Sequence, residues 1–264
     1  MDIESFVRDG YVAVRGAFST QTAKECRELI WNSLRDQGIE PEDSSTWTRP
    51  RVMVPCPEAE PFAVAGTSDV LAAAYDQLIG PGRWTRRAGV GGAVPVCFPS
   101  EQCPESGLGY HFEGSYDGPG GYWVNVRSRA RGLLALFLFS DVGPDDAPTR
   151  LIVGSHLEVP PMLAPFGDAG VLGSEVYGKW PHTLLCRQIA HATGNAGDVY
   201  LCHPFIVHTA TWPHRGTVPR MMAQPGIHVR EGFAIDGSDP SPVAQAIVAG
   251  LGGASGSSKY HHQP

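Results

Sequence analysis

The sequence predicts a mainly β protein in which many short antiparallel strands form a sandwich or a closed barrel and helices cover the outside. The chain contains 32 Gly and 23 Pro among 264 residues, a content that suits a turn-rich β architecture better than a helical bundle. From Trp84 onward, short apolar runs are separated by Gly, Pro, Asp and Asn, which is typical of strands joined by turns.

The first part of the chain predicts one strand and two covering helices. Tyr11–Arg15 alternates with a period of two, which indicates a strand. A helix is expected from a cap at Ser19, Thr20 or Thr22, because apolar residues then recur on one face as far as Gly38. A second helix is expected from Thr67 or Ser68 to Gly80-Pro81-Gly82.

The remaining strands are predicted from apolar runs bounded by turn residues. The candidates are Val94–Phe98, Leu133–Phe139, Leu151–Val153, Val199–Cys202 and Met221–Val229. The stretch Tyr116–Tyr122 reads Tyr-Asp-Gly-Pro-Gly-Gly-Tyr. It predicts a mobile loop with aromatic residues at its rim.

Charge and cysteine content exclude several classes of protein. The net charge of −7 argues against binding of nucleic acid by phosphate neutralisation. The six cysteines are scattered without a Cys-x-x-Cys pair, so we expect reduced thiols. The N-terminus lacks a signal-like pattern and no long apolar run occurs, so we expect a cytoplasmic protein without a membrane partner.

The segment Gly109–Gly114 contains the first candidate for chemistry, His111-Phe112-Glu113. On an extended strand, residues two apart point to the same face, so an imidazole and a carboxylate would lie side by side. Such a pair suits Fe(II), Mn(II) or Zn(II) if a distant strand supplies a third ligand. A single His-x-Glu also occurs without any function, so the motif needs a partner.

The chain after the apolar run Val199–Cys202 carries the candidate partner. It contains His203 and His208, which face opposite ways on one extended run, so only one of them is expected to meet His111. Arg220 follows at the head of another apolar strand. A buried arginine there needs an anionic partner, and a dicarboxylate co-substrate would supply one.

The order of these residues resembles that of the phytanoyl-CoA dioxygenase family of Fe(II)/2-oxoglutarate-dependent oxygenases. The resemblance covers most of the chain. It includes the opening strand Phe6–Gly16, the metal strand 109–114, Leu136–Val142 with Gly154-Ser155-His156, and Ala196–Arg220. It implies a double-stranded β-helix, a cupin-like jelly roll with flanking α-helices.

We expect one domain over residues 1–264. Its three parts are mostly helical N-terminal cladding over 1–85, the jelly-roll core over 86–235, and a short helix with a flexible tail over 236–264.

The resemblance also implies the site residues. His111, Glu113 and His208 correspond to the iron ligands, and Arg220 to the partner of the distal carboxylate of 2-oxoglutarate. The family usually has aspartate at the position of Glu113. It also tends to have serine at the position of Ala210, for which Thr211 or Thr209 would substitute.

The implied reaction uses Fe(II), 2-oxoglutarate and O₂ to hydroxylate or otherwise oxidise a small organic molecule, with formation of succinate and CO₂. Because a carboxylate ligand is retained, hydroxylation is favoured over halogenation. No acid or base side chain is required. Candidate pocket residues are Tyr110, Tyr116, Trp123 and Arg127.

Other readings of the same residues stay open. The basic segment Arg127–Arg131 is either a solvated edge or a site for an anionic or CoA-linked substrate. We expect His156 in a turn, His203 bonded to the backbone, and His214 at the rim or surface. Two alternative functions are a cupin-like isomerase or hydrolase without 2-oxoglutarate, and a non-catalytic ligand-binding barrel.

Overall fold

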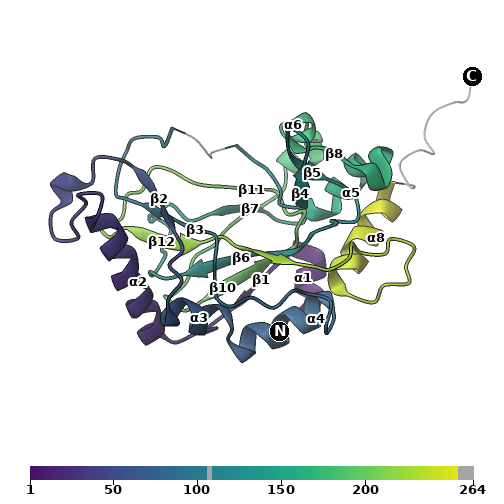
Figure 1. Cartoon of the computed structure of the whole chain (residues 1–264). Coiled ribbons are helices and arrows are strands. Elements are labelled where there is room, and N and C mark those ends of the chain that lie inside the picture. The colour runs from purple at the N-terminus through teal and green to yellow at the C-terminus, as the bar shows by residue number, and fades with distance from the viewer. Residues whose placement is uncertain (106–108, 255–264) are drawn as a thin grey trace, which may run out of the picture.

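The fold centres on an antiparallel sheet of seven strands in a computed structural model that describes residues 1–105 and 109–254. The strand order is β1-β10-β6-β12-β3-β2, and β13 also pairs with β6 (Figure 1). The bounds are β1 Tyr11–Val14, β2 Arg51–Pro55, β3 Ala93–Cys97, β6 Arg131–Leu138, β10 Val199–Cys202, β12 Arg220–Ala223 and β13 Gly226–His228.

Two smaller sheets complete the β structure. One has the order β11-β7-β9 and the other β4-β5-β8, and the pairs in both are antiparallel. Their bounds are β4 Ser115–Gly118, β5 Gly121–Val124, β7 Arg150–Ile152, β8 Val171–Leu172, β9 Ile189–His191 and β11 His208–Thr209. The expectation of a mainly antiparallel β protein with helices is therefore confirmed.

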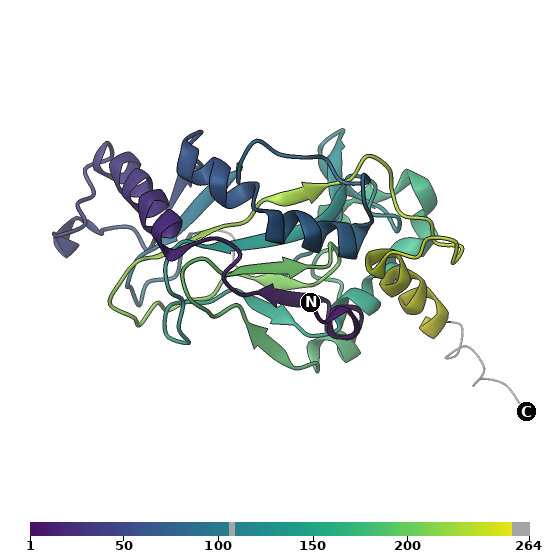
Figure 2. The same cartoon turned by 90° about the horizontal axis from the view of Figure 1, so that it is seen from below.

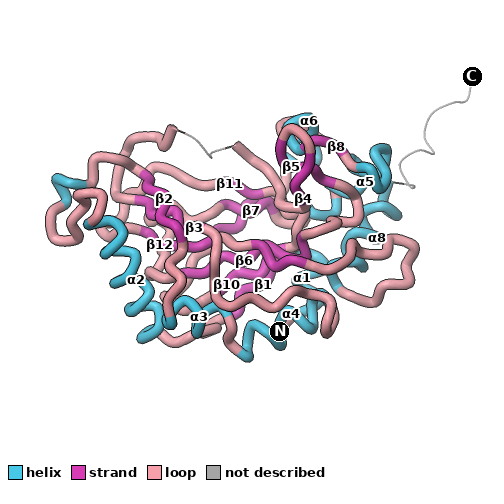
Figure 3. The backbone as a smooth tube through the Cα atoms, in the orientation of Figure 1, coloured by secondary structure: helices cyan, strands magenta, loops and turns pink. Residues whose placement is uncertain are grey.

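Helices surround the strands, which occupy the middle of the molecule (Figure 3). The longer ones are α1 Ile3–Asp9, α2 Thr20–Arg35, α3 Glu60–Gly66, α4 Asp69–Ile79 and α8 Pro242–Ala254. Short ones are α5 Val159–Leu163, α6 Gly173–Val176, α7 His182–Leu185, and the 3-10 turns η1 Ser44–Thr46, η2 Ser155–Leu157 and η3 Ala164–Ala169.

The two predicted covering helices begin at predicted caps. The Ser19 hydroxyl accepts a hydrogen bond from the Thr22 amide, and the Ser68 hydroxyl accepts one from the Leu71 amide. Figures 1 and 2 show α2, α3 and α4 along one side of the main sheet. Their buried faces belong to the same apolar cluster as one face of that sheet.

The strand β6 divides the apolar interior into two clusters. Leu133, Ala135 and Phe137 belong to the cluster beneath the helices. The alternate residues Leu134, Leu136 and Leu138 belong to a second cluster, which includes Leu151 of the smaller sheet and Ala192, the residue after β9. The two-residue period of a strand produces this division. Both faces of β6 are therefore buried, which explains its uninterrupted apolar sequence.

The prediction of a loop over Tyr116–Tyr122 is wrong. This stretch is the hairpin of β4 and β5, with Tyr116 opposite Trp123 and a two-residue turn at Pro119-Gly120. Gly120 has φ of +80°, a conformation that glycine adopts without the steric penalty of a Cβ. The glycines that suggested a loop thus permit a tight turn between paired strands.

Three other strand predictions need correction. The strand predicted at Tyr11–Arg15 is confirmed as β1, but the first part of the segment Phe6–Gly16, which resembled the family's opening strand, is helical, because α1 extends to Asp9 with Asp2 as its cap. Met221–Val229 forms two strands, since Pro225 between them has no amide to donate. The segment 1–85 also contributes β1 and β2 to the main sheet, and β2 was not expected.

Three further expectations concern the cysteines, the C-terminal tail and membrane-spanning helices. All six cysteines are free thiols, as predicted. The tail expected after α8 lies, from residue 255, outside the described residues. No helix within 1–105 and 109–254 has the length and apolarity needed to cross a membrane.

Two buried histidines join the N-terminal and C-terminal helices. The rings of His156 and His203 lie 4.9 Å apart between centroids. The Nε2 of His156 bonds to the Val7 carbonyl at 3.0 Å and that of His203 to the Val243 carbonyl at 3.2 Å. These contacts confirm the turn position of His156 and the backbone bond of His203. Gly10 is required here, because a Cβ would lie 2.4 Å from His156 Nδ1.

Acid should destabilise the fold through this pair. Burial lowers the pKa of His156 to about 4 and that of His203 well below its usual range. The unfolded chain keeps histidine pKa values near 6.5, so below that pH it binds protons that the native state does not. Stability is therefore fully present above pH 6.5 and falls as the pH decreases toward 4, by about 1.4 kcal/mol per pH unit for each histidine.

Urea unfolding at pH 7.5 and 5.0 measures this effect. His156→Gln should reduce the pH dependence, whereas the same change at the exposed His191 should leave it as in the wild type. An unchanged dependence in His156→Gln would contradict the prediction.

Candidate metal centre

The segment that carries His111 and Glu113 is held by backbone hydrogen bonds to the chain around His208. The His111 amide donates to the His208 carbonyl at 3.1 Å and the His208 amide to the His111 carbonyl at 2.9 Å. The Glu113 amide donates to the Pro204 carbonyl at 2.9 Å. Phe112, between the two candidate ligands, is buried against Phe205.

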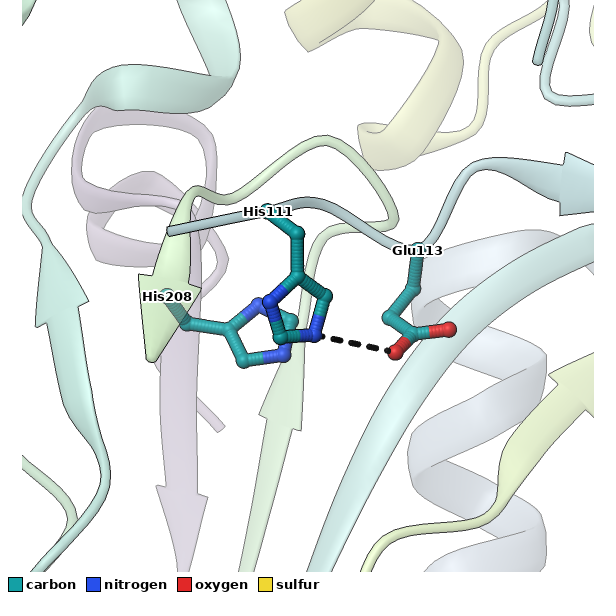
Figure 4. A group of neighbouring side chains, drawn as sticks. All are labelled: His111, Glu113 and His208. Carbon is teal, nitrogen blue, oxygen red and sulfur yellow. Dashed lines mark ion pairs between the residues drawn. The ribbon is translucent and has the colours of Figure 1, made fainter. Parts of the chain in front are cut away.

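The side chains of His111, Glu113 and His208 point toward one another (Figure 4). One ligand atom from each lies within 4.8 Å of the other two. The Nε2 of His111 is 3.6 Å from Oε1 of Glu113, and the two imidazole centroids are 4.4 Å apart. The choice that the sequence left open between His203 and His208 thus falls on His208, while His203 lies against His156.

Backbone carbonyls orient both imidazoles. His111 Nδ1 bonds to the Gly109 carbonyl at 2.9 Å, and His208 Nδ1 bonds to the Ile206 carbonyl at 3.1 Å. A carbonyl only accepts, so each Nδ1 carries the proton and each Nε2 keeps a lone pair. This arrangement is the usual way in which proteins fix the tautomer of a metal-binding histidine.

The charges of the group also suit a divalent cation. Burial acts to raise the pKa of Glu113, but the imidazole of His111 and the positive groups nearby outweigh it and hold the pKa at about 2. Burial lowers the pKa of His208 to about 4. For His111, burial acts downward, but the contact with Glu113 prevails and raises its pKa. At neutral pH the group therefore offers an ionised carboxylate and a neutral His208.

Arg131 lies beside this group, a contact that sequence reasoning missed. Its guanidinium is 3.4 Å from Oε2 of Glu113, and its Nε is buried without a hydrogen-bond partner among the described residues. Gly226 makes room for it, because a Cβ there would lie 1.9 Å from the guanidinium. Of the basic segment 127–131, Arg131 turns toward the metal group while Arg129 is exposed.

Arg220 is fully buried, with 1% of its surface exposed. Its guanidinium donates to the Ala147 carbonyl and to Cys97 Sγ, and its Nε has no partner among the described residues. No carboxylate of residues 1–105 and 109–254 forms an ion pair with it. Arg220 is thus a buried cation without an anion.

Strand register directs Arg220 and His208 into the same space. Arg220 lies on the face of β12 that carries Met222, and His208 is paired with Leu151. Both Met222 and Leu151 belong to the second apolar cluster, between the main sheet and β7. Because paired residues and residues two apart share a face, the histidine and the arginine both point between these sheets.

Thr209 and Thr211 were expected to substitute for the serine that the family tends to have at the position of Ala210. Neither is placed as His208 is. Thr209 is paired with Arg150, on the opposite face of β11. The Thr211 hydroxyl donates to the Pro148 carbonyl. The expectation of a surface position for His214 is wrong, because its backbone pairs with Ser100 and only 4% of its surface is exposed.

The four predicted pocket residues lie in two settings. Tyr110 is half-buried next to His111. Tyr116 and Trp123 line one surface hollow of about 530 Å³, and Arg127 lines another of about 410 Å³. Neither lining includes a metal-ligand candidate. Tyr177, which no sequence pattern singled out, lies with its ring 6.3 Å from that of His111 and donates to the Phe112 carbonyl.

Comparison of the fold with solved structures gives clear similarities. HygX from Streptomyces hygroscopicus, with nickel, 2-oxoglutarate and hygromycin B bound, has a TM-score of 0.50, 15% identity and 87% coverage of both chains. The epimerase SnoN, in complex with Fe³⁺, α-ketoglutarate and nogalamycin RO, has a TM-score of 0.53 and 17% identity, with coverage of 86% of this chain and 81% of that chain. The chain shares their fold.

A third similar structure is SnoK, the non-heme α-ketoglutarate-dependent carbocyclase of nogalamycin biosynthesis. Its TM-score is 0.52 at 14% identity, with coverage of 86% of this chain and 82% of that chain. No family model matches the sequence, and no curated protein matches it. The resemblance to the phytanoyl-CoA dioxygenase family therefore stays a prediction, and these similarities establish the fold alone.

Proposed function

We propose that this protein is an Fe(II)/2-oxoglutarate-dependent oxygenase with a jelly-roll core, which oxidises a small organic molecule. The observation that carries the proposal is the pairing of two features in one space. One feature is the group of His111, Glu113 and His208; the other is Arg220, a buried arginine without an anionic partner in the described chain. Both face the gap between the main sheet and β7.

His111, Glu113 and His208 would hold the iron. Two imidazole nitrogens and one carboxylate oxygen form the ligand set typical of non-heme Fe(II) oxygenases, and three protein ligands leave other positions open. The donors fit, because the Nδ1 atoms of both histidines are bonded to backbone carbonyls, which leaves the two Nε2 atoms for the metal, and Glu113 is ionised at neutral pH. The solved neighbours HygX and SnoN, with nickel and Fe³⁺ respectively, support a metal at this place.

Arg220 would bind the distal carboxylate of 2-oxoglutarate. A buried guanidinium without an anion is costly, and a carboxylate satisfies it by charge and by hydrogen bonds. Iron held by these three residues would supply the oxidising chemistry, with 2-oxoglutarate and O₂ as co-substrates and succinate and CO₂ as by-products. The chain binds and orients both reactants, and the apolar second cluster excludes water from the space.

The partner of this site is a small molecule, as it is for HygX and SnoN, whose structures contain hygromycin B and nogalamycin RO. We propose hydroxylation because Glu113 retains a carboxylate in the ligand set. We further propose a cytoplasmic enzyme with neither nucleic acid nor a membrane as partner, in line with its net charge of −7.

Anaerobic titration of the apo-protein with Fe(II) and then with 2-oxoglutarate tests the proposal. A weak visible charge-transfer band should form, and O₂ should then yield succinate. Iron binding without the band would indicate instead a metal enzyme that does not use 2-oxoglutarate. Failure of both would indicate a barrel with a non-catalytic role.

Replacement of Glu113 tests the carboxylate ligand. Glu113→Gln keeps the shape but removes the charge, so Fe(II) affinity should fall by about 100-fold or more, whereas Glu113→Asp should lose less. Calorimetric titration with Fe(II) or Mn(II) measures both, and Glu231→Gln, at an exposed carboxylate, is the control. Equal affinity of Glu113→Gln and wild type would remove Glu113 from the ligand set.

A further inference from the structure

A second buried N–H donor near Arg220 lacks an acceptor. The Nδ1 of His214 accepts a hydrogen bond from the Gly216 amide at 3.2 Å. In the neutral ring the proton is therefore on Nε2. That nitrogen is buried and has no hydrogen-bond partner among the described residues. Because an unsatisfied buried donor costs about 1–3 kcal/mol, it indicates a missing acceptor.

His214 and Arg220 are held along the same neighbouring segment. His214 exchanges two backbone hydrogen bonds with Ser100, at 3.0 and 2.9 Å. Arg220 is paired with Cys97, three residues earlier on that segment. The Nε of Arg220 is likewise buried without a partner. Two buried donors thus come from one region, and neither nitrogen forms a hydrogen bond of ordinary geometry with an acceptor of the described chain.

The surroundings of His214 keep its ring neutral. Burial is the main cause that lowers its pKa, and the positive charge of Arg220 acts in the same direction, while the carboxylate of Asp146 and the backbone carbonyl of Val218 oppose it. The Oδ2 of Asp146 already accepts from the Gly143 amide at 2.7 Å. A neutral imidazole next to a guanidinium is a donor that adds no further positive charge.

We propose that His214 is a co-substrate-binding residue, whose Nε2–H and the guanidinium of Arg220 donate to the same distal carboxylate of 2-oxoglutarate. This inference rests on the proposed function. Ala210 has no side-chain donor to help hold 2-oxoglutarate, and the placement of Thr209 and Thr211 does not suit that role. His214 would supply the donor instead. A carboxylate has two oxygens and about four acceptor positions, so it satisfies both residues at once.

The dissociation constant of 2-oxoglutarate, measured under anaerobic conditions from the charge-transfer band of the Fe(II)-loaded protein, tests this role. His214→Ala should raise that constant about tenfold, which is the effect expected from the loss of one hydrogen bond to a charged group. His214→Gln, which keeps an N–H donor, should restore part of the affinity. The Fe(II) affinity should stay unchanged in both, and His182→Ala, at an exposed position, is the control.

A second ligand separates binding of the carboxylate from a general effect on the fold. 2-Oxobutyrate has the same keto-acid end but no distal carboxylate, so the wild type and His214→Ala should bind it equally. Equal affinity of both proteins for 2-oxoglutarate, or equal weakening for the two ligands, would overturn the role of His214.

If His214→Ala does not fold, His214→Gln is compared with His214→Phe instead. His214→Gln should bind 2-oxoglutarate more tightly than His214→Phe, which has no donor. Equal weakening in the Gln and Phe variants would overturn the role. Absence of any band with wild-type protein would instead refute the proposed function itself, so the two failures are distinguishable.

Discussion

His208→Ala should abolish specific Fe(II) binding and with it the O₂-dependent formation of succinate. The buried imidazole of His208 is one of the three proposed ligands, and its Nδ1 is already bonded to the Ile206 carbonyl. The nearby His203 does not replace it, because its Nε2 bonds to the Val243 carbonyl at the C-terminal helix. We expect the affinity for Fe(II) to fall by at least about 100-fold, as measured by calorimetric titration.

The exposed His182 provides the control, since His182→Ala should bind Fe(II) as the wild type does. Circular dichroism of the apo-proteins checks that His208→Ala keeps the fold. Iron binding by a folded His208→Ala at wild-type strength would place the metal centre elsewhere.

Arg220→Met should weaken 2-oxoglutarate binding by about 100-fold or more, because a charged, buried hydrogen-bonded pair is worth 2–5 kcal/mol when one partner is removed. The opposite effect is expected on the free protein. Methionine removes a buried cation that has no anionic partner in the described chain and leaves an apolar side chain of similar shape. The free energy of unfolding of the apo-protein should therefore be unchanged or higher.

Thermal unfolding with and without 2-oxoglutarate measures both effects in the Fe(II)-loaded and apo-proteins. The wild type should gain stability with the ligand, and Arg220→Met should not. Arg215→Met, at an exposed position on the same connection, should behave as the wild type. Retention of the ligand-induced gain in Arg220→Met would assign the carboxylate to another residue.

Local patterns predicted the features that depend on neighbours in sequence. The apolar run of β6, the caps Ser19 and Ser68, and the His111-x-Glu113 pair are examples, because strand alternation and capping act over two or three residues. The hairpin of β4 and β5 could not be predicted in this way. Its register is set by the Pro119-Gly120 turn and by pairing with β8, which is distant in sequence.

Burial of single polar residues was the second type of feature that sequence patterns could not predict. Arg131 resembles Arg127 and Arg129 in composition and spacing, and only the pairing of β6 with β13 and the space at Gly226 bring it to Glu113. His214 has the turn-rich neighbourhood of a surface residue. Its burial depends on the pairing with Ser100, more than a hundred residues earlier.

The buried pair of His156 and His203 has a consequence for truncated proteins. Val7 in α1 and Val243 in α8 are the two ends of a chain of contacts that passes through His156 and His203. The Nδ1 of His203 also accepts a hydrogen bond from the Phe205 amide, at the turn that leads to His208. Deleting either terminal helix would remove an acceptor and disturb that turn. Loss of iron from a shortened protein would therefore arise without any change to the ligands themselves.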